Sequence, residues 1–367
     1  MPMGLSAGFH AAVSQHDAAG HATVLHVAAG AAAGYTGPPE LTPARALTEW
    51  MLDPWALIVI LVLTAAYLAG VRRVRRSGQP WPAGRVIASC GLGSGFAIIA
   101  TMSFLRVYQP VLFYARAAQT IVLLLLVPVF WAMGRPITLA IAALPRAGRR
   151  VEAVIASRAA RLVTFPAITT MVLVVTPFLL YFTGWYAAGF TSGAVRELTY
   201  AALLAPGFVF FWTLLRIDPV PKAYPYLVSL WISAAEVIGD AILGLAIIAD
   251  PTLIAAAHYH LVARPWGPSP ATDQVLGGGT IWVLGDIVGL PFLVAQLIQM
   301  IREDEADAKV IDAELDAAAE PSAAGSAASA SPAQRPWWET DQRIAGRFQP
   351  VTGSSPDQDQ SRLARDQ

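Results

Sequence analysis

Seven long runs of apolar residues, separated by short polar segments, make up most of this chain. Each run is long enough to cross about 30 Å of hydrocarbon as a helix, which takes about 20 residues. The runs are continuously apolar rather than alternating, and bare backbone groups are not tolerated in lipid, so helices are expected rather than a β-barrel. The predicted spans are Trp55–Val71, Val86–Ser103, Arg116–Met133, Val163–Phe182, Leu198–Leu215, Leu227–Ile248 and Gly277–Ile301.

The arginines between these runs predict how the helices are oriented. The segments after the first, third and fifth runs are rich in arginine, beginning with VRRVRRSGQPWPAGR from Val71 to Arg85, whereas the intervening loops hold few. Lysine and arginine concentrate in cytoplasmic loops. The sequence therefore predicts an all-α integral membrane protein, a bundle of about seven transmembrane helices with the N-terminus out and the C-terminus in, located in a prokaryotic plasma membrane.

Changes in composition divide the chain into four predicted parts. Residues 1–52 form an extracytoplasmic segment with four histidines, and residues 53–303 form the seven-helix membrane domain. Residues 304–320 read as a polar cytoplasmic extension of the last helix, and the Ala-, Ser- and Pro-rich residues 321–367 as a disordered cytoplasmic tail. Trp337 and Trp338 are the unusual feature of that tail, with either a docking role or none.

Composition narrows the function classes. Charged residues make up 14% of the chain, against about a quarter in soluble domains. The zero formal net charge and the lack of a basic face argue against nucleic-acid binding. The single cysteine, Cys90, excludes an intrachain disulfide and a multi-cysteine metal site. No phosphate-binding loop or zinc-protease motif is present. These patterns favour binding, chaperoning or transport over enzymatic catalysis.

Polar residues within the apolar runs are candidates for function, because a charge at membrane depth is costly unless it is paired or hydrated. Glu236 and Asp240 lie four residues apart and therefore on one helix face. The alternative is interhelical packing, with the arginines near helix ends reaching the headgroups. The predicted polar cluster in the outer half of the bundle consists of Arg116, Gln119, Thr120, Arg196, Tyr200, Glu236, Asp240, Trp282 and Asp286.

Two histidines in the last outer loop form a candidate metal site. His258 and His260 are separated by one residue, so an extended loop would let both imidazoles ligate one ion. Imidazole suits copper and zinc. The pair is a weak motif, and no metal is the alternative interpretation.

Four segments together resemble the CtaG-type cytochrome c oxidase assembly proteins, a family of seven-helix membrane proteins. The resemblance runs from about Asp53 to Glu303. It rests on YLAGVRRVRRSGQPWP (Tyr67–Pro82), LVPVFWAMGRPITLAIAALP (Leu126–Pro145), GFVFFWTLLRIDPVP (Gly207–Pro221) and DQVLGGGTIWVLGDI (Asp273–Ile287). It implies an accessory role in maturing the copper centre of a haem–copper oxidase, with oxidase subunits and the lipid bilayer as partners.

The sequence departs from the family where copper ligands are expected. Family members carry two H-x-x-x-H pairs, which fall here on Arg116, Thr120, Arg196 and Tyr200. An arginine stays protonated and has no lone pair to offer a metal. Copper therefore remains a possible cargo without the family's ligands. The alternatives are a transporter or permeation pathway for copper or protons that uses Glu236, Asp240 and Asp286, and a non-metallating relative whose arginines bind an anionic group.

Overall fold

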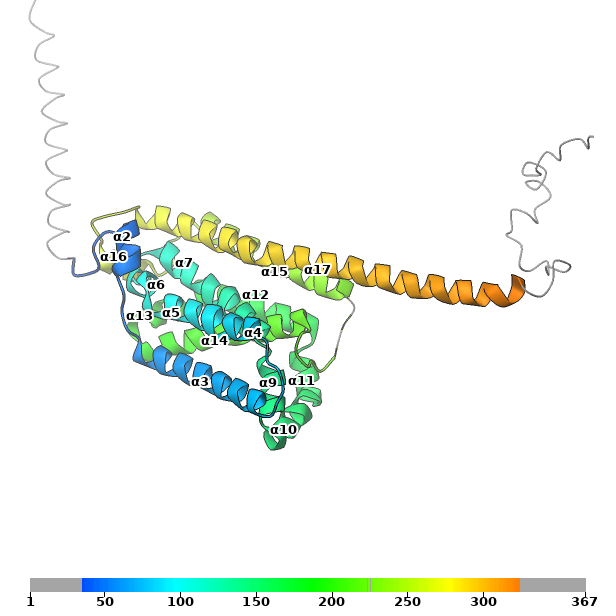
Figure 1. Ribbon diagram of the computed structural model, residues 1–367. Coiled ribbons are helices and arrows are strands. Elements are labelled where there is room, and N and C mark those ends of the chain that lie inside the picture. The colour runs from blue at the N-terminus through cyan, green and yellow to red at the C-terminus, as the bar shows by residue number, and fades with distance from the viewer. Residues whose placement is uncertain (1–34, 223, 225, 324–367) are drawn as a thin grey trace, which may run out of the picture. The chain divides into compact units, whose positions relative to one another are not determined.

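The computed structural model describes residues 35–222, 224 and 226–323, and in these residues it contains helices and no strand (Figure 1). The N-terminal histidines and Trp337 and Trp338 lie outside the described residues. The elements, labelled as in Figure 1, are α2 (Pro43–Thr48), α3 (Pro54–Arg76), α4 (Ala83–Val86), η1 (Ile87–Gly93), α5 (Ser94–Met102), α6 (Phe104–Tyr108), α7 (Phe113–Ile121), η2 (Val122–Leu126), α8 (Val127–Met133), α9 (Pro136–Ala143), α10 (Pro145–Ile155), α11 (Arg158–Val163), α12 (Pro166–Phe182), α13 (Trp185–Thr191), α14 (Gly193–Leu215), α15 (Tyr226–Ala249), α16 (Ala256–Val262) and α17 (Pro270–Ala323).

The predicted spans are confirmed as helices. Six helical segments of the described chain are long and apolar enough to cross a membrane, and α12 with α13 makes a seventh if that pair, bent by 67°, counts as one span. Two spans are composite: α4, η1 and α5 are continuous with each other, and so are α7, η2 and α8. The π-helical segments η1 and η2 insert wider turns into these spans. The protein is therefore an all-helical, multi-pass membrane protein.

The two ends of the bundle differ in chemistry. Helix α3 begins at one end with Asp53 as its N-cap and Pro54 at its first turn, a common helix start. It finishes at the other end with Arg73, Arg75 and Arg76 in its last turn, where cations meet the negative end of the helix dipole. We call these the Asp53 end, which holds α2, α6, α13 and α16, and the Arg73 end, which holds α9 to α11 (Figure 1).

The centre of the bundle depends on a close helix crossing. Gly207 in α14 lies so near η2 that a Cβ atom there would collide with the Leu124 carbonyl and with Pro128. Small residues at such crossings allow backbones to approach in membrane proteins. Buried side chains of α14, among them Leu203, Phe210 and Phe211, complete the surrounding core.

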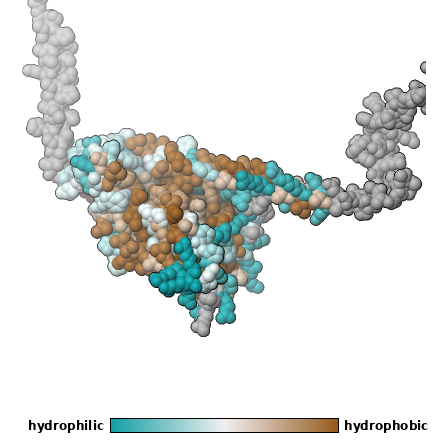
Figure 2. Space-filling model, in the orientation of Figure 1, coloured by the Kyte–Doolittle hydropathy of each residue, from teal (hydrophilic) through white to brown (hydrophobic). Residues whose placement is uncertain are grey.

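The arginine-rich stretch after the third span folds into α9, α10 and α11. Helix α9 packs against the bundle, with Leu139 buried beside Gly70 of α3. Figure 2 shows a hydrophobic surface over the transmembrane helices and a hydrophilic patch where α3 ends. This contrast is typical of a protein whose sides face lipid and whose ends face water.

Within the described residues, the compact unit that contains the bundle ends at Met300, and a second unit begins at Ile301. Helix α17 continues through residues 304–320, which were predicted to extend the last span. The helix ends at Ala323, and the rest of the tail predicted over residues 321–367 lies outside the described residues.

Candidate functional site

A buried aspartate gathers two arginines at the Asp53 end. Asp53 Oδ1 accepts a hydrogen bond from the Ala56 amide as the cap of α3. Its Oδ2 lies 3.7 Å from Arg106 Nε and 3.4 Å from Arg196 Nη2. Arg196 also lies 3.3 Å from Glu197 Oε1. Asp53 therefore joins α3, α6 and α14 through one carboxylate, and the sequence analysis did not single it out.

Arg116 lies in α7 and is only 2% exposed, so it does not reach the headgroups. Its Nη1 donates a hydrogen bond to Gln109 Oε1. The guanidinium carbon lies 5.2 Å from the ring centre of Tyr186 and 5.3 Å from that of Phe190, which are cation–π distances. Burial raises the pKa of the nearby Tyr259 phenol above its ordinary value, so this group stays neutral. Arg116 is thus held by an amide and aromatic rings.

The other predicted polar residues of α7 make interhelical hydrogen bonds. Gln119 Nε2 donates to the Ala100 carbonyl of α5 at 2.7 Å. Thr120 Oγ1 donates to the Arg116 carbonyl at 2.9 Å and lies 3.1 Å from the Tyr181 hydroxyl of α12. Both side chains are buried. Their contacts indicate that they fix the packing of α7.

Several polar atoms at the Asp53 end are buried and have no hydrogen-bond partner within the described part of the chain. They are Asp53 Oδ2, Arg106 Nε, Arg116 Nη2, Arg196 Nε and Tyr200 Oη. Buried polar atoms are normally satisfied, and a group of exceptions points to a missing water or ligand. Arg106 and Arg196 pair with Asp53 and Glu197, and Arg116 is held by Gln109 and two aromatic rings. The unsatisfied N–H groups of these arginines suit a hydrogen-bond acceptor.

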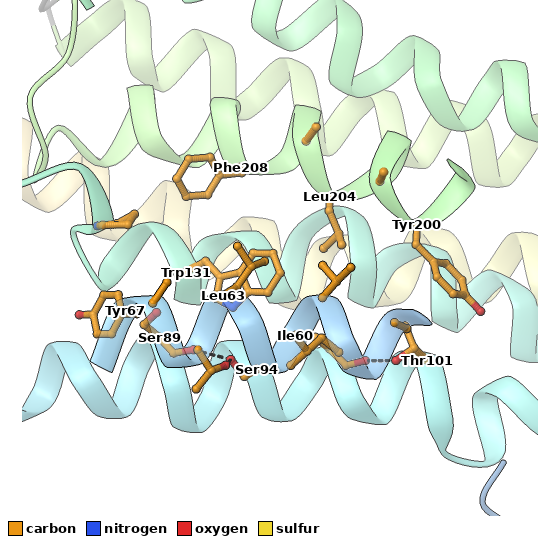
Figure 3. Close-up of a pocket in the computed structure, with 18 of the residues that line it drawn as sticks. Ile60, Leu63, Tyr67, Ser89, Ser94, Thr101, Trp131, Tyr200, Leu204 and Phe208 are labelled. Carbon is orange, nitrogen blue, oxygen red and sulfur yellow. Dashed lines mark hydrogen bonds between the residues drawn. The ribbon is translucent and has the colours of Figure 1, made fainter. Parts of the chain in front are cut away.

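A groove leads from this charged cluster along the membrane-facing side of the bundle. It has a volume of about 1490 Å³ and lies between α3 and α14, over a floor formed by α5, η2 and α8. Figure 3 shows Tyr200, Leu204 and Phe208 projecting from α14 toward the face of α3 that carries Ile60, Leu63 and Tyr67.

The groove is about as long as the hydrocarbon layer of a membrane is thick. Its lining runs from Trp55 to Arg73 along α3, which is roughly 27 Å at 1.5 Å per residue and close to the hydrocarbon thickness. Small residues recur along both walls, a composition that lets another helix approach closely. The small lining residues are Ala56, Ala66, Ala69 and Gly70 on α3, with Gly193, Ala194, Ala201 and Ala205 on α14.

The predicted acidic residues form a second, separate group. Glu236 and Asp240 of α15 are each 3% exposed and lie close to Asp286 of α17. None of the ion pairs found in the described chain joins this group to an arginine. Trp282 is 37% exposed and packs beside Gly244. The single polar cluster expected from the sequence is therefore divided between the Asp53 end and the α15–α17 interface.

The two histidines do not lie in an extended loop, because residues Ala256–Val262 form the short helix α16. Side chains two residues apart on an α-helix point in directions that differ by about 200° around the helix axis. His258 Nε2 donates to the Pro110 carbonyl at 2.7 Å, and its ring stacks 3.9 Å from that of Phe190. His260 is exposed. Shared metal ligation by the pair would require α16 to unwind.

Two aspartates from the quoted motifs are helix caps. The carboxylate of Asp273 accepts hydrogen bonds from the Phe113 and Tyr114 amides at the start of α7, at 3.0 and 3.2 Å, and pairs with Arg264 at 2.9 Å. The carboxylate of Asp218 likewise accepts from the amides of Ile137 and Thr138 at the start of α9. These motif residues connect segments that are distant in sequence.

The Asp53 end does not fit a metal. Arg116 and Arg196 offer only donors, and Thr120 and Tyr200 are weak ligands in their neutral forms. Within the described residues, no group of three or more His, Cys, Asp or Glu side chains is arranged to hold a metal ion. The side chains present at the expected copper positions therefore act as hydrogen-bond donors and packing groups.

These features define a multi-pass helical membrane protein with a charged, buried cluster at one end of a groove that follows the length of α3. A family sequence model, described as cytochrome c oxidase caa3 assembly factor, matches residues 65–303. The chain belongs to this family. The match includes the groove face of α14 and the second half of α3, whereas Asp53 precedes it.

The relatives found are mycobacterial proteins of unknown role. Uncharacterised proteins of Mycobacterium bovis and Mycobacterium tuberculosis are each 30% identical over 301 residues, which is 77% of this chain and 45% of theirs. One from Mycobacterium leprae is 29% identical over 279 residues, covering 74% and 42%. The chain thus spans less than half the length of these relatives. No solved structure matches it significantly.

Proposed function

We propose that this protein is a plasma-membrane accessory factor that supports maturation of the copper centre of a haem–copper oxidase by binding an oxidase subunit. Family membership supports the assembly role. The observation that carries the proposal beyond the family is the groove between α3 and α14.

The occupant that best fits this groove is one transmembrane helix of an oxidase subunit. An acyl chain fills one leaflet, whereas this groove continues across the hydrocarbon thickness. Its small-residue walls suit close helix packing. The unsatisfied N–H groups of Arg106 and Arg196 at the Asp53 end complement an acidic or carbonyl group on that helix.

In this proposal α14 binds the partner rather than the metal, and Arg116 of α7 holds helices together. Arg116 and Arg196 occupy two of the positions where the family resemblance leads one to expect imidazoles. Copper is then cargo that reaches the oxidase from another donor while this protein holds the subunit. Purified protein is expected to contain copper well below one ion per chain.

Deletion of the gene tests the proposal, with oxidase activity and copper per oxidase as the two measurements. We expect both to fall and to be restored by the wild-type chain. Normal activity and normal copper occupancy in the deletion strain would contradict the assembly role.

A pair of neighbouring alanines tests the groove itself. Ala66 lines the groove, whereas Ala65 is exposed on α3 without lining it. Ala66→Phe fills the groove and is expected to leave the deletion strain deficient in oxidase, although the variant accumulates in the membrane. Ala65→Phe adds the same ring beside it and is expected to restore oxidase. Equal restoration by both variants would exclude the groove as the binding surface.

A further inference from the structure

Three carboxyl groups with unsatisfied atoms meet at the interface of α15 and α17. Glu236 Oε1, Asp240 Oδ2 and Asp286 Oδ1 are buried and make no hydrogen bond within the described part of the chain. Glu236 and Asp240 are more than nine-tenths buried as whole residues. This group lies apart from the groove and is not used by the proposed assembly role.

The two carboxyl groups of α15 are aimed at the backbone of α17. A Cβ atom at Gly289 would lie 2.9 Å from Glu236 Oε2, and one at Gly285 would lie 3.1 Å from the Asp240 carboxyl carbon. Gly285 directly precedes Asp286, so the three carboxyl groups share one stretch of the interface. Glu236 and Asp240 are four residues apart on α15, and the two glycines they face are four residues apart on α17. Each carboxyl group therefore lies where α17 carries no side chain.

The polar contacts continue along the same interface. Gln296 of α17 donates from Nε2 to Ser233 Oγ of α15 at 2.8 Å. Gln296 Oε1 is also buried without a hydrogen-bond partner in the described chain. Ser233 lies three residues before Glu236 and therefore on the same helix face. The interface thus holds neutral polar groups as well as acids.

The cation that contacts α15 is distant from the acids: Arg216, at the end of α14, donates a hydrogen bond to Ser229, seven residues and about 10 Å along the helix before Glu236. Helices α12 and α17 pack against this part of α15, and neither α12, α15 nor residues 270–300 of α17 contains Lys, Arg or His. Their other titratable groups are engaged elsewhere: Tyr181 lies 3.1 Å from the Thr120 hydroxyl, and Asp273 pairs with Arg264. The three carboxyl groups therefore face one another, and the ion pairs of the described residues include none of them.

Charge at this position must be neutralised from outside the chain. A buried ionised carboxylate without a partner takes up a proton rather than remain charged, and neighbouring carboxylates disfavour each other's ionisation. A bound metal is not favoured, since no set of three acidic, His or Cys side chains in the described chain has metal-site geometry. The proton is the ligand that one carboxyl oxygen can hold alone.

We propose that Glu236 and Asp240, beside Asp286 of α17, form an intramembrane proton-binding site, in which the carboxyl groups of α15 hold exchangeable protons at neutral pH. Protons on Glu236 and Asp240 are held by the pair rather than by one residue, because the charge of each affects the other. Release of a proton places a charge against the backbone of α17, so the packing of α15 on α17 depends on pH.

Infrared spectroscopy of the purified full-length protein in lipid nanodiscs tests this site directly. The wild-type protein is expected to show the carbonyl band of protonated carboxylic acids at neutral pH, and the band is expected to weaken as the pH rises. Glu236→Gln and Asp240→Asn should each remove part of the band. Asp304→Asn, which changes an exposed carboxylate on the polar extension, should leave it unchanged.

Two outcomes would overturn the proposal: a wild-type spectrum without this band at neutral pH, or a band that persists in the triple variant with Asp286→Asn. Labelling by dicyclohexylcarbodiimide, which modifies protonated carboxyl groups in apolar surroundings, provides a second measurement on unaltered protein. Peptides containing Glu236 or Asp240 are expected to be labelled. Protection of these peptides by added sodium or potassium would instead indicate a cation site. Neither readout depends on oxidase, so failure here is separate from failure of the assembly role.

Discussion

At the scale of single residues, the structure separates charges that bind from charges that hold helices together. Arg116 illustrates the second kind, because its guanidinium is held by Gln109 and two aromatic rings inside the protein. Arg196 faces both Asp53 and the groove, so it is available to a partner. Arg116 and Arg196 both stand at positions where the family resemblance predicts a histidine, and yet their surroundings in the structure differ.

Gly207 provides a residue-scale prediction about packing. Gly207→Ala places a methyl group against the backbone of η2 at Leu124, which cannot move aside easily. Overpacking of this kind costs about 1–3 kcal/mol. Thermal unfolding in detergent is expected to occur at a clearly lower temperature than for the wild type.

Gly95→Ala is the matched control for this substitution. No atom lies within 4 Å of a Cβ atom at Gly95, which is also helical. Its unfolding temperature is expected to stay the same or rise slightly, because alanine favours the helix. A similar loss in both variants would contradict the close crossing at Gly207.

The burial of single acids could be predicted from the sequence, whereas their partners could not. Glu236 and Asp240 lie well inside an apolar run, so burial followed from position alone. Asp53 lies at the edge of a run and looks like a surface cap in the sequence. Its importance arises from Arg106 and Arg196, which are distant in the chain and meet it only in the fold.

At the scale of helices, buried aspartates fix where helices begin. Asp273 binds two amides at the start of α7 from about 160 residues away in the chain. Side-chain oxygens at helix starts satisfy amides that lack a partner in the helix, and negative charge suits that end of the helix dipole. The Asp-Gln pair of the quoted motif therefore has a structural role at the Asp53 end, where Gln274 also accepts from the Ile254 amide at 2.7 Å.

An alanine at position 273 tests this capping role. Asp273→Ala leaves two amides of α7 unsatisfied and Arg264 buried without its acid. Loss of one partner from a buried pair costs about 3–5 kcal/mol. The amount of folded protein in the membrane and its unfolding temperature should both fall sharply. Thr272→Ala, at an exposed neighbour, should change neither. Equal behaviour of the two variants would argue against the cap.

The sequence predicted the long helices well and the short ones poorly. Apolar runs identify spans because lipid requires a fixed length of apolar helix. We expected a loop at His258 and His260, but both residues lie in the short helix α16. This helix has seven residues, too few to show a periodic pattern in the sequence. The 67° bend between α12 and α13 was not apparent either. Such features depend on packing with segments far away in the chain.

At the scale of the whole molecule, the fold is a membrane bundle with two unlike ends. The arginine distribution predicts that the Asp53 end lies outside and that the Arg73 end faces the cytoplasm. The alternating direction of successive helices across the bundle is a property of the structure. Which end of the bundle faces the cytoplasm stays a prediction.

Cysteine accessibility tests this orientation. Replacement of Cys90, the single cysteine, by serine gives a background for new cysteines at Thr252 and Gln79, which lie in loops at opposite ends. A membrane-impermeant maleimide is expected to label Thr252→Cys in intact cells and Gln79→Cys only after the cells are opened. The reverse pattern would show that the bundle is inverted.

The central claim is that the groove between α3 and α14 holds a helix of an oxidase subunit, and site-specific photocrosslinking tests it most directly. A photoreactive amino acid replaces Ala66, which lines the groove, or Ala65, which does not, in the full-length protein produced in cells that make the oxidase. We expect a crosslink to an oxidase subunit from position 66 and none from position 65. No oxidase crosslink from position 66, or the same crosslinks from both positions, would contradict it.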